Sequence, residues 1–131
     1  MREKREWNII EALNWTADYF RKNSLATPRL DAEILLAGVL NVERIYLYTH
    51  YDQPLSEEER VTYRALVKRR IAGEPVSYIR KQKEFWSRLL YVDQRVLIPR
   101  PETETVVEVV KERFKKREAS GRITMIDVCC G

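Results

Sequence analysis

The sequence predicts a mainly α-helical fold, in which an N-terminal helical bundle is followed by a β-hairpin and by the truncated start of an α/β domain. Two observations predict it. Apolar residues recur at helical spacing through residues 5–72, and the pattern then changes to short apolar runs around tight turns. We therefore divide the chain into a helical domain (1–75), a linker with the hairpin (76–100) and the first helix and strand of a second domain (101–131).

The composition excludes several classes of protein. The 131 residues are 44% apolar and carry a net charge of +4, with acidic and basic residues interleaved along the predicted helices. No apolar run approaches the ~20 residues of a membrane span. The charged N-terminus lacks the apolar core of a signal peptide, so we expect a cytoplasmic protein that does not enter a membrane. The mild net charge favours a solvated surface over a nucleic-acid-binding patch.

The first two helices are predicted over residues 5–22 and from Pro28 to about Asn41. Thr27 followed by Pro28 is a start signal, because the threonine hydroxyl caps the helix and proline suits its first position. The apolar stripes that predict these helices are Ile10, Leu13, Ala17 and Phe20 in the first, and Leu30, Ile34, Leu35 and Val39 in the second.

Two further helices complete the predicted bundle. A short one covers residues 43–48, and a longer one begins at Ser56, which forms a capping box with Glu59. Basic residues in its last turn, followed by Gly73, are typical of a helix C-terminus, and we prefer this explanation of the basic cluster to RNA binding. The apolar residues of the longer helix are Val61, Leu66, Val67 and Ile71.

The last third of the chain predicts a hairpin, a helix and a strand. Residues 84–86 and 89–92 form the two arms of the hairpin around a turn at Ser87 and Arg88. The helix covers residues 102–116, and a strand that would normally be buried begins at Ile123. Its neighbouring strands are missing from this sequence, so we expect residues 123–130 to be disordered, to pack irregularly or to pair with another copy. The apolar stripe of the helix consists of Val106, Val107, Val110 and Phe114.

The segment Pro99-Arg100-Pro101 is a candidate binding site. Each proline fixes its own φ, and Pro101 also disfavours the helical region for Arg100. The Arg100 guanidinium is therefore predicted on an extended backbone just before a helix N-terminus, whose free amides favour a carboxylate ligand. Glu102 and Thr103 lie in or beside that first turn. From composition alone, an ordinary helix start with acids near its positive end is the favoured explanation of the same residues, because such starts are common.

The C-terminal segment is a second candidate. A strand followed by small residues and a glycine is how a parallel βα unit brings its backbone close to a nucleotide-like ligand. Asp127, near the end of that strand, is placed to orient an amino group of the ligand. A buried strand before a glycine turn is also a common structural feature. The segment reads Ile126, Asp127, Val128, Cys129, Cys130 and Gly131.

The cysteines and the histidine argue against a disulfide and against a metal site. Cys129 and Cys130 are adjacent, so their Cα atoms lie about 3.8 Å apart, below the roughly 4.4 Å that an ordinary disulfide requires. His50 is the only histidine in the sequence, so the ligands of a zinc site are not available. We expect reduced thiols and no bound metal.

Taken together and in this order, four segments resemble the bacterial release factor glutamine methyltransferases: residues 73–79, 84–86, 96–104 and 127–131. The most specific of them is Leu97 to Glu104. In that family a small helical domain, joined by a β-hairpin, precedes a Rossmann-like methyltransferase domain. The family transfers a methyl group from S-adenosyl-L-methionine to the glutamine side-chain nitrogen in the Gly-Gly-Gln loop of peptide chain release factors.

The resemblance also implies roles for individual residues. Arg100, Glu102 and Thr103 would lie beside the cofactor, and the C-terminal segment would begin the loop under its methionine part. Many family members have glycine where Cys129 stands, which makes a close backbone approach less assured there. The cofactor-binding residues implied are Arg100, Glu102, Thr103, Asp127, Cys129, Cys130 and Gly131.

No catalytic residue is predicted within this sequence. The family holds the substrate amide with an Asn-Pro-Pro-Tyr motif, and this motif does not occur among the 131 residues. We therefore expect a fragment that recognises release factors but, alone, neither methylates them nor binds the cofactor tightly. Two alternatives stay open: a helical protein- or RNA-binding module, and a related ribosomal RNA or DNA amino-methyltransferase.

Overall fold

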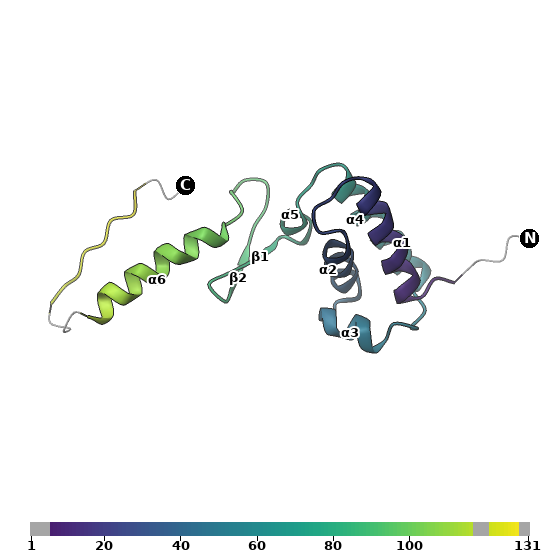
Figure 1. The fold of residues 1–131 in the computed structure, drawn as a ribbon, viewed down its shortest axis with the longest axis horizontal. Coiled ribbons are helices and arrows are strands. Elements are labelled where there is room, and N and C mark those ends of the chain that lie inside the picture. The colour runs from purple at the N-terminus through teal and green to yellow at the C-terminus, as the bar shows by residue number, and fades with distance from the viewer. Residues whose placement is uncertain (1–5, 117–120, 129–131) are drawn as a thin grey trace, which may run out of the picture. The chain divides into compact units, whose positions relative to one another are not determined.

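The computed structural model describes residues 6–116 and 121–128 of the chain. The chain divides into two compact units, Met1–Arg80 and Lys81–Gly131. Most of the described residues are helical, and a two-stranded antiparallel hairpin follows the helices of the first unit (Figure 1). The predictions of a mainly helical chain and of a β-hairpin are therefore confirmed.

Two helices of the first unit begin at capping boxes. Helix α1 (Ile9–Lys22) follows Asn8, whose side chain accepts a hydrogen bond from the Glu11 amide at 2.9 Å. This cap explains why the helix begins at Ile9 and not near residue 5 as predicted. Helix α4 (Glu57–Ile71) begins at the predicted Ser56 box, where the Glu59 amide donates to the Ser56 hydroxyl at 3.1 Å.

Helix α2 (Pro28–Leu40) begins and ends where the sequence predicts, but its N-terminal cap differs. The Thr27 hydroxyl makes no capping bond to the backbone and instead donates to the Asp31 carboxylate at 2.8 Å. The Asp31 carboxylate is charged and is therefore a strong acceptor for the Thr27 hydroxyl. The hydroxyl does not cap the helix backbone, so the predicted cap is wrong. Asn41 ends the helix in the left-handed region, with φ of 54°. The short helix α3 (Arg44–Thr49) follows.

Helix α2 is the central element of the first unit, because it packs against α1, α3 and α4. A helix with neighbours on several sides is not buried along a single stripe, and the predicted stripe of α2 is therefore partly wrong. Leu35 is buried as predicted, whereas Leu30 is exposed. The core comprises Ile9, Ala12, Leu13, Phe20, Ala32, Leu35, Leu36, Ala37, Leu47, Leu55, Tyr63, Val67 and Ile79.

A fifth helix, α5 (Val76–Arg80), was not predicted. It packs against α2 and α4 and buries Ile79. The Pro75 carbonyl accepts hydrogen bonds from the amides of Tyr78 and Ile79 at 3.0 and 3.1 Å, which closes its single turn. Five residues are too few to show a helical period in the sequence.

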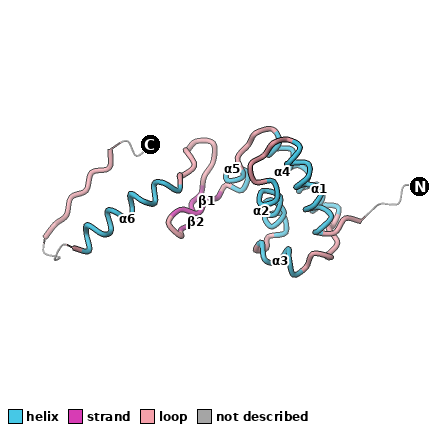
Figure 2. The backbone as a smooth tube through the Cα atoms, in the orientation of Figure 1, coloured by secondary structure: helices cyan, strands magenta, loops and turns pink. Residues whose placement is uncertain are grey.

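The hairpin consists of β1 (Gln82–Phe85) and β2 (Arg88–Tyr91), shown in magenta in Figure 2. Phe85 pairs with Arg88, so the two turn residues are Trp86 and Ser87. Their φ angles of 51° and 54° are those of a type I′ turn, which matches the twist of the strands. The predicted turn at Ser87 and Arg88 was one residue late.

Helix α6 (Pro101–Lys115) matches its prediction to within one residue, but none of its side chains is buried. The strand predicted from Ile123 is absent: residues 122–128 have no regular structure and are exposed. A strand requires a partner for its backbone hydrogen bonds, and no described segment pairs with these residues. Ile126 is 81% exposed, which agrees with the prediction that this segment is irregular without partner strands.

Candidate functional site

The start of α6 has the backbone that the sequence predicts. Arg100 is the residue that precedes the helix, with φ of −89° and ψ of 143°, and Pro101 is the first helical residue. The Arg100 carbonyl accepts a hydrogen bond from the Thr103 amide at 3.1 Å, which closes the first turn. The Arg100 side chain is exposed and makes no capping bond to the helix. A guanidinium is thus held on extended backbone beside a helix N-terminus.

Glu102 and Thr103 lie in this first turn, and both are exposed. The N-terminal end of a helix carries partial positive charge, which stabilises a bound anion, although here Pro101 has no amide hydrogen and the Thr103 amide already donates to the Arg100 carbonyl. Arg100 adds a full positive charge next to this end of the helix. The combination is suited to a carboxylate or phosphate group.

Glu104, also in the first turn, anchors the hairpin, a role for which the sequence carries no local signal. Its carboxylate accepts a hydrogen bond from the backbone amide of Trp86 at 2.9 Å. The Lys111 ammonium lies 5.0 Å from the centroid of the Trp86 ring, a cation–π contact with the next part of the same helix. Glu104 and Lys111 together hold the hairpin turn against α6 and fix the start of this helix.

Of the remaining predicted site residues, Asp127 is the one that lies in the described part of the chain, and it is not brought to this helix start. Asp127 is exposed in the irregular segment 121–128. In the described part of the chain, no hydrogen bond or ion pair joins Asp127 to Arg100, Glu102 or Thr103. The predictions for Cys129, Cys130 and Gly131 lie outside the described residues.

The helical unit contains a buried ionic cluster around Glu33, whose side chain is only 1% exposed. Arg29 and Arg44 each donate to its carboxylate at 2.8 Å, and the Tyr48 hydroxyl donates at 2.6 Å. Burial raises the pKa of Glu33, but these hydrogen bonds outweigh it, so its pKa is lowered below the ordinary value of 4.5. Glu33 therefore remains charged and joins α2 to α3. Sequence analysis had no signal for it, because glutamate is rarely a core residue.

A second ion pair joins α2 to α4. Arg70 donates to the Asp31 carboxylate at 3.0 Å, and both side chains are largely buried. The basic residues in the last turn of α4 are predicted to offset the negative end of the helix dipole, which accounts for their positive charge. The pair with Asp31 is an additional, tertiary role for Arg70.

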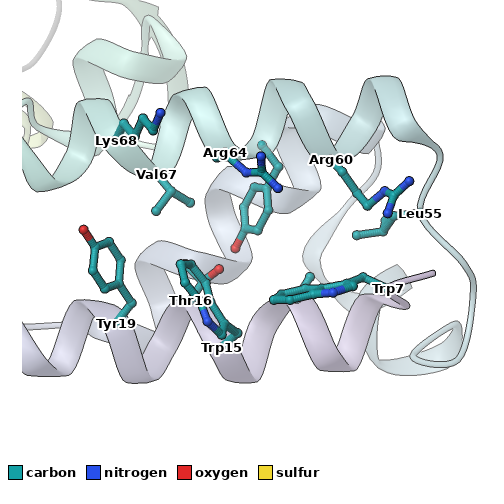
Figure 3. A pocket seen from close by; sticks show the side chains of 11 residues that line it. Trp7, Trp15, Thr16, Tyr19, Leu55, Arg60, Arg64, Val67 and Lys68 are labelled. Carbon is teal, nitrogen blue, oxygen red and sulfur yellow. The ribbon is translucent and has the colours of Figure 1, made fainter. Parts of the chain in front are cut away.

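The helical unit also has a groove between α1 and α4, which we call the basic–aromatic groove (Figure 3). Its cavity measures about 420 Å³. The basic side chains come from α4, and the aromatic ones come from α1, from Trp7 before it and, in the case of Tyr63, from α4. The groove has no local signal in the sequence, because more than 30 residues separate the two helices. Its lining residues are Trp7, Ala12, Trp15, Thr16, Tyr19, Leu55, Arg60, Tyr63, Arg64, Val67 and Lys68.

Two classes of site are absent from the described residues. No helix there combines the length and apolar character needed to cross a bilayer. No group of three or more His, Cys, Asp or Glu side chains in residues 6–116 and 121–128 is placed to hold a metal ion.

The fold and its surface define a small helical domain with its own core, followed along the chain by a hairpin and a proline-flanked helix. A family model described as the PrmC N-terminal domain matches residues 11–80. This match covers more than half of the chain, and the chain belongs to that family.

Several curated relatives are similar over both units. A protein of Rhodopirellula baltica named release factor glutamine methyltransferase is 43% identical over 129 residues, which cover 95% of this chain and 43% of the relative. Proteins of the same name from Chlorobaculum tepidum and Leptospira interrogans are 42% and 39% identical, over 87% and 95% of this chain. The chain spans less than half the length of these relatives.

Proposed function

We propose that this chain is the N-terminal part of a release factor glutamine methyltransferase, which works in the cytoplasm. The whole protein would transfer a methyl group from S-adenosylmethionine to the glutamine of the Gly-Gly-Gln loop in a peptide chain release factor. The observation that carries this proposal is the extent of the similarity. It continues past the helical domain, through the hairpin and α6, in relatives that bear this name.

We assign residues 1–75 to recognition of the release factor, 76–100 to the linker and 101–131 to the start of a Rossmann-like cofactor domain. The apolar side chains of α6 support the last assignment. Val106, Val109 and Phe114 are exposed, as are the apolar residues of the segment after it. Such surface is normally buried against a sheet in an α/β domain.

The residues at the start of α6 fit the methionine part of the cofactor. The exposed guanidinium of Arg100, beside the positive end of the helix dipole, can bind its carboxylate, and Glu102 can bind its ammonium group. Asp127, Cys129, Cys130 and Gly131 are assigned to the loop below it. When bound, the cofactor supplies a methyl group on a positively charged sulfur. The residues named here would bind and orient it.

The chain contributes positioning, and the groups that activate the substrate lie elsewhere in the proposed enzyme. An amide nitrogen is a poor nucleophile because its lone pair is delocalised, so it must be held in line with the methyl group. Fixing the orientation of reacting groups can lower a reaction barrier by ~7–11 kcal/mol, and holding the amide in line would supply several kcal/mol of this. We therefore expect the 131-residue chain to be inactive by itself.

A chimeric enzyme tests the proposal. In it, this chain replaces the matching N-terminal residues of the Rhodopirellula baltica relative, and transfer of labelled methyl from S-adenosylmethionine to a bacterial release factor is measured. We expect the chimera to methylate the Gly-Gly-Gln glutamine. The chain alone serves as the control and should show no transfer and, by calorimetry, no micromolar cofactor binding. A folded chimera that methylates RNA or DNA in place of the release factor would contradict the proposal.

A further inference from the structure

The basic–aromatic groove exists because α1 and α4 both pack mainly on α2 and make little contact with each other. Its buried floor includes Thr16 and Tyr63, and the Tyr63 hydroxyl donates to the Ala32 carbonyl of α2 at 3.2 Å. Burial raises the pKa of Tyr63, so the phenol stays neutral. One end is closed by Leu55, whose amide donates to the Trp7 carbonyl at 2.8 Å. The groove therefore rests on fixed helices and a hydrogen-bonded end.

The wall formed by α1 consists of aromatic rings that support one another. Trp15 stacks on Tyr19 with ring centroids 5.2 Å apart, and Trp7 meets Trp15 edge-on at 5.9 Å. Trp15 is nevertheless 51% exposed and Tyr19 is 37% exposed. Large aromatic side chains that are rigid and half-exposed are typical of the centres of protein–protein interfaces.

The wall formed by α4 is positively charged. Arg60, Arg64 and Lys68 follow one another at intervals of four residues and so lie on one face of the helix (Figure 3). Among the described residues that line the groove there is no aspartate or glutamate. Three cations around an apolar cavity, with no acidic residue in the lining, favour an anionic occupant that also has apolar parts.

We propose that the basic–aromatic groove binds an acidic segment of a partner protein, with one or two apolar side chains of that segment inserted between the helices. Given the proposed function, on which this choice of partner rests, the segment belongs to the release factor. The carboxylates would face Arg64 and Lys68, and the apolar side chains would contact Trp15 and Val67. A cavity of about 420 Å³ is sufficient for such side chains.

The geometry favours a peptide over RNA. Single-stranded nucleic acid binds by stacking its bases on free aromatic faces. Here Trp15 and Tyr19 are stacked on each other, which occupies one face of each ring. The α1 wall carries no cation in the lining, whereas a nucleic-acid backbone is followed by positive charge along its length.

Binding measurements on the 131-residue chain test the proposal. The groove variant is Arg64→Gln with Lys68→Gln, and the matched control is Arg113→Gln with Lys115→Gln, which removes the same charge from the last turns of α6. A third variant, Trp15→Ala, leaves the charges in place. All four residues of the charge variants are exposed, and circular dichroism melting confirms that each variant is folded.

The probes are a purified bacterial release factor, a synthetic helical peptide of glutamate and leucine, its lysine and leucine counterpart, and oligouridylate. We expect calorimetry to show that the groove variant binds the release factor about tenfold more weakly than the original chain, because rim charges and central aromatic residues contribute at this level. Trp15→Ala should weaken binding by a similar factor. The control should stay within about twofold of the original chain, since its charges lie outside the groove.

Release factor binding that is equally strong in the groove variant and the control overturns the groove and leaves the proposed function intact. If only the glutamate peptide binds, and the groove variant weakens it, the groove is supported and the release factor is not its partner. A chain that binds neither the release factor nor the glutamate peptide overturns the proposal. So does oligouridylate binding that exceeds peptide binding and is lost in the groove variant, because the groove then serves nucleic acid.

Discussion

Glu33 shows at the scale of a single residue how a charge is kept inside a small domain. Removing a carboxylate from water is unfavourable unless its oxygens are hydrogen-bonded and its charge is balanced. Both oxygens of Glu33 accept bonds from arginines, and one also accepts from Tyr48. No buried side-chain nitrogen or oxygen in the described residues is left without a hydrogen-bond partner. The buried charge therefore joins helices α2 and α3 without an unsatisfied group.

Replacing this carboxylate tests its contribution to stability. We expect Glu33→Gln to lower the free energy of unfolding at pH 7 by about 2–3 kcal/mol, because charge-assisted hydrogen bonds contribute about 1.5–3 kcal/mol. Urea unfolding followed by circular dichroism gives the value. Glu58→Gln, an exposed change on α4, is the control and should stay within about 0.5 kcal/mol.

The same residue makes stability depend on pH. The folded pKa of Glu33 is lowered below 4.5, so its stabilisation is complete above the unfolded pKa and is lost as the pH falls through the folded pKa. The Glu33→Gln variant has no proton to gain there. Its unfolding free energy should therefore fall less than that of the original chain between about pH 5 and pH 3. Equal losses in both proteins would assign the acid sensitivity to other carboxylates.

At the scale of elements, Glu104 joins the hairpin to α6. The Trp86 amide donates to Glu104 within a type I′ turn, so two elements that bury little apolar surface hold each other in place. Their geometry thus depends on one hydrogen bond and one cation–π contact more than on a core. Loss of Glu104 should therefore loosen the hairpin and leave the helical unit unchanged.

Hydrogen exchange checks this prediction. Glu104→Ala should increase the exchange rate of the Trp86 amide by about tenfold, since a neutral-to-charged hydrogen bond contributes about 1.5 kcal/mol. Glu104→Gln keeps a hydrogen-bond acceptor and should therefore change the exchange rate of the Trp86 amide less. Glu108→Ala removes an exposed carboxylate from the same helix and is the matched control. An unchanged Trp86 rate in Glu104→Ala would show that other contacts hold the turn.

Elements were predictable from the sequence where the signal is local. The box at Ser56, the proline at the start of α2 and the asparagine at its end each depend on side chains within four residues of one another, and the structure has all three. Helix α5 and the exact hairpin turn were missed. The former is only one turn long and is held by packing on α2 and α4. The hairpin turn requires a positive φ at Trp86, a conformation that bulky residues rarely adopt, so the residue type does not indicate the turn.

At the scale of the whole molecule, the core belongs to one unit. Every residue of the hydrophobic cluster lies between Trp7 and Ile79. Of the described residues from Lys81 onward, Val92 alone is among the buried apolar residues. The stability of the chain should therefore come from its first unit.

Removing the second unit tests this. A chain of residues 1–80 should unfold cooperatively, with a midpoint within about 4–8 °C of the 131-residue chain, the shift that about 1 kcal/mol produces in a domain of this size. Thermal melting followed by circular dichroism at 222 nm gives the midpoint. Residues 81–131 alone are the comparison and should show no cooperative transition. A broad, non-cooperative melt of residues 1–80 would mean that the second unit contributes to the core.

The sequence by itself determined the helical class of this chain, the main helix boundaries, the hairpin and the family to which the chain belongs. These depend on periodicity, caps and motifs, which are properties of neighbouring residues. Only the tertiary structure decided that Glu33 and Asp31 are buried, that α2 is surrounded by other helices, and that Arg64 and Lys68 face Trp15 across a groove. Each of these joins residues far apart in the sequence, and burial and charge pairing between distant segments arise only when the chain folds.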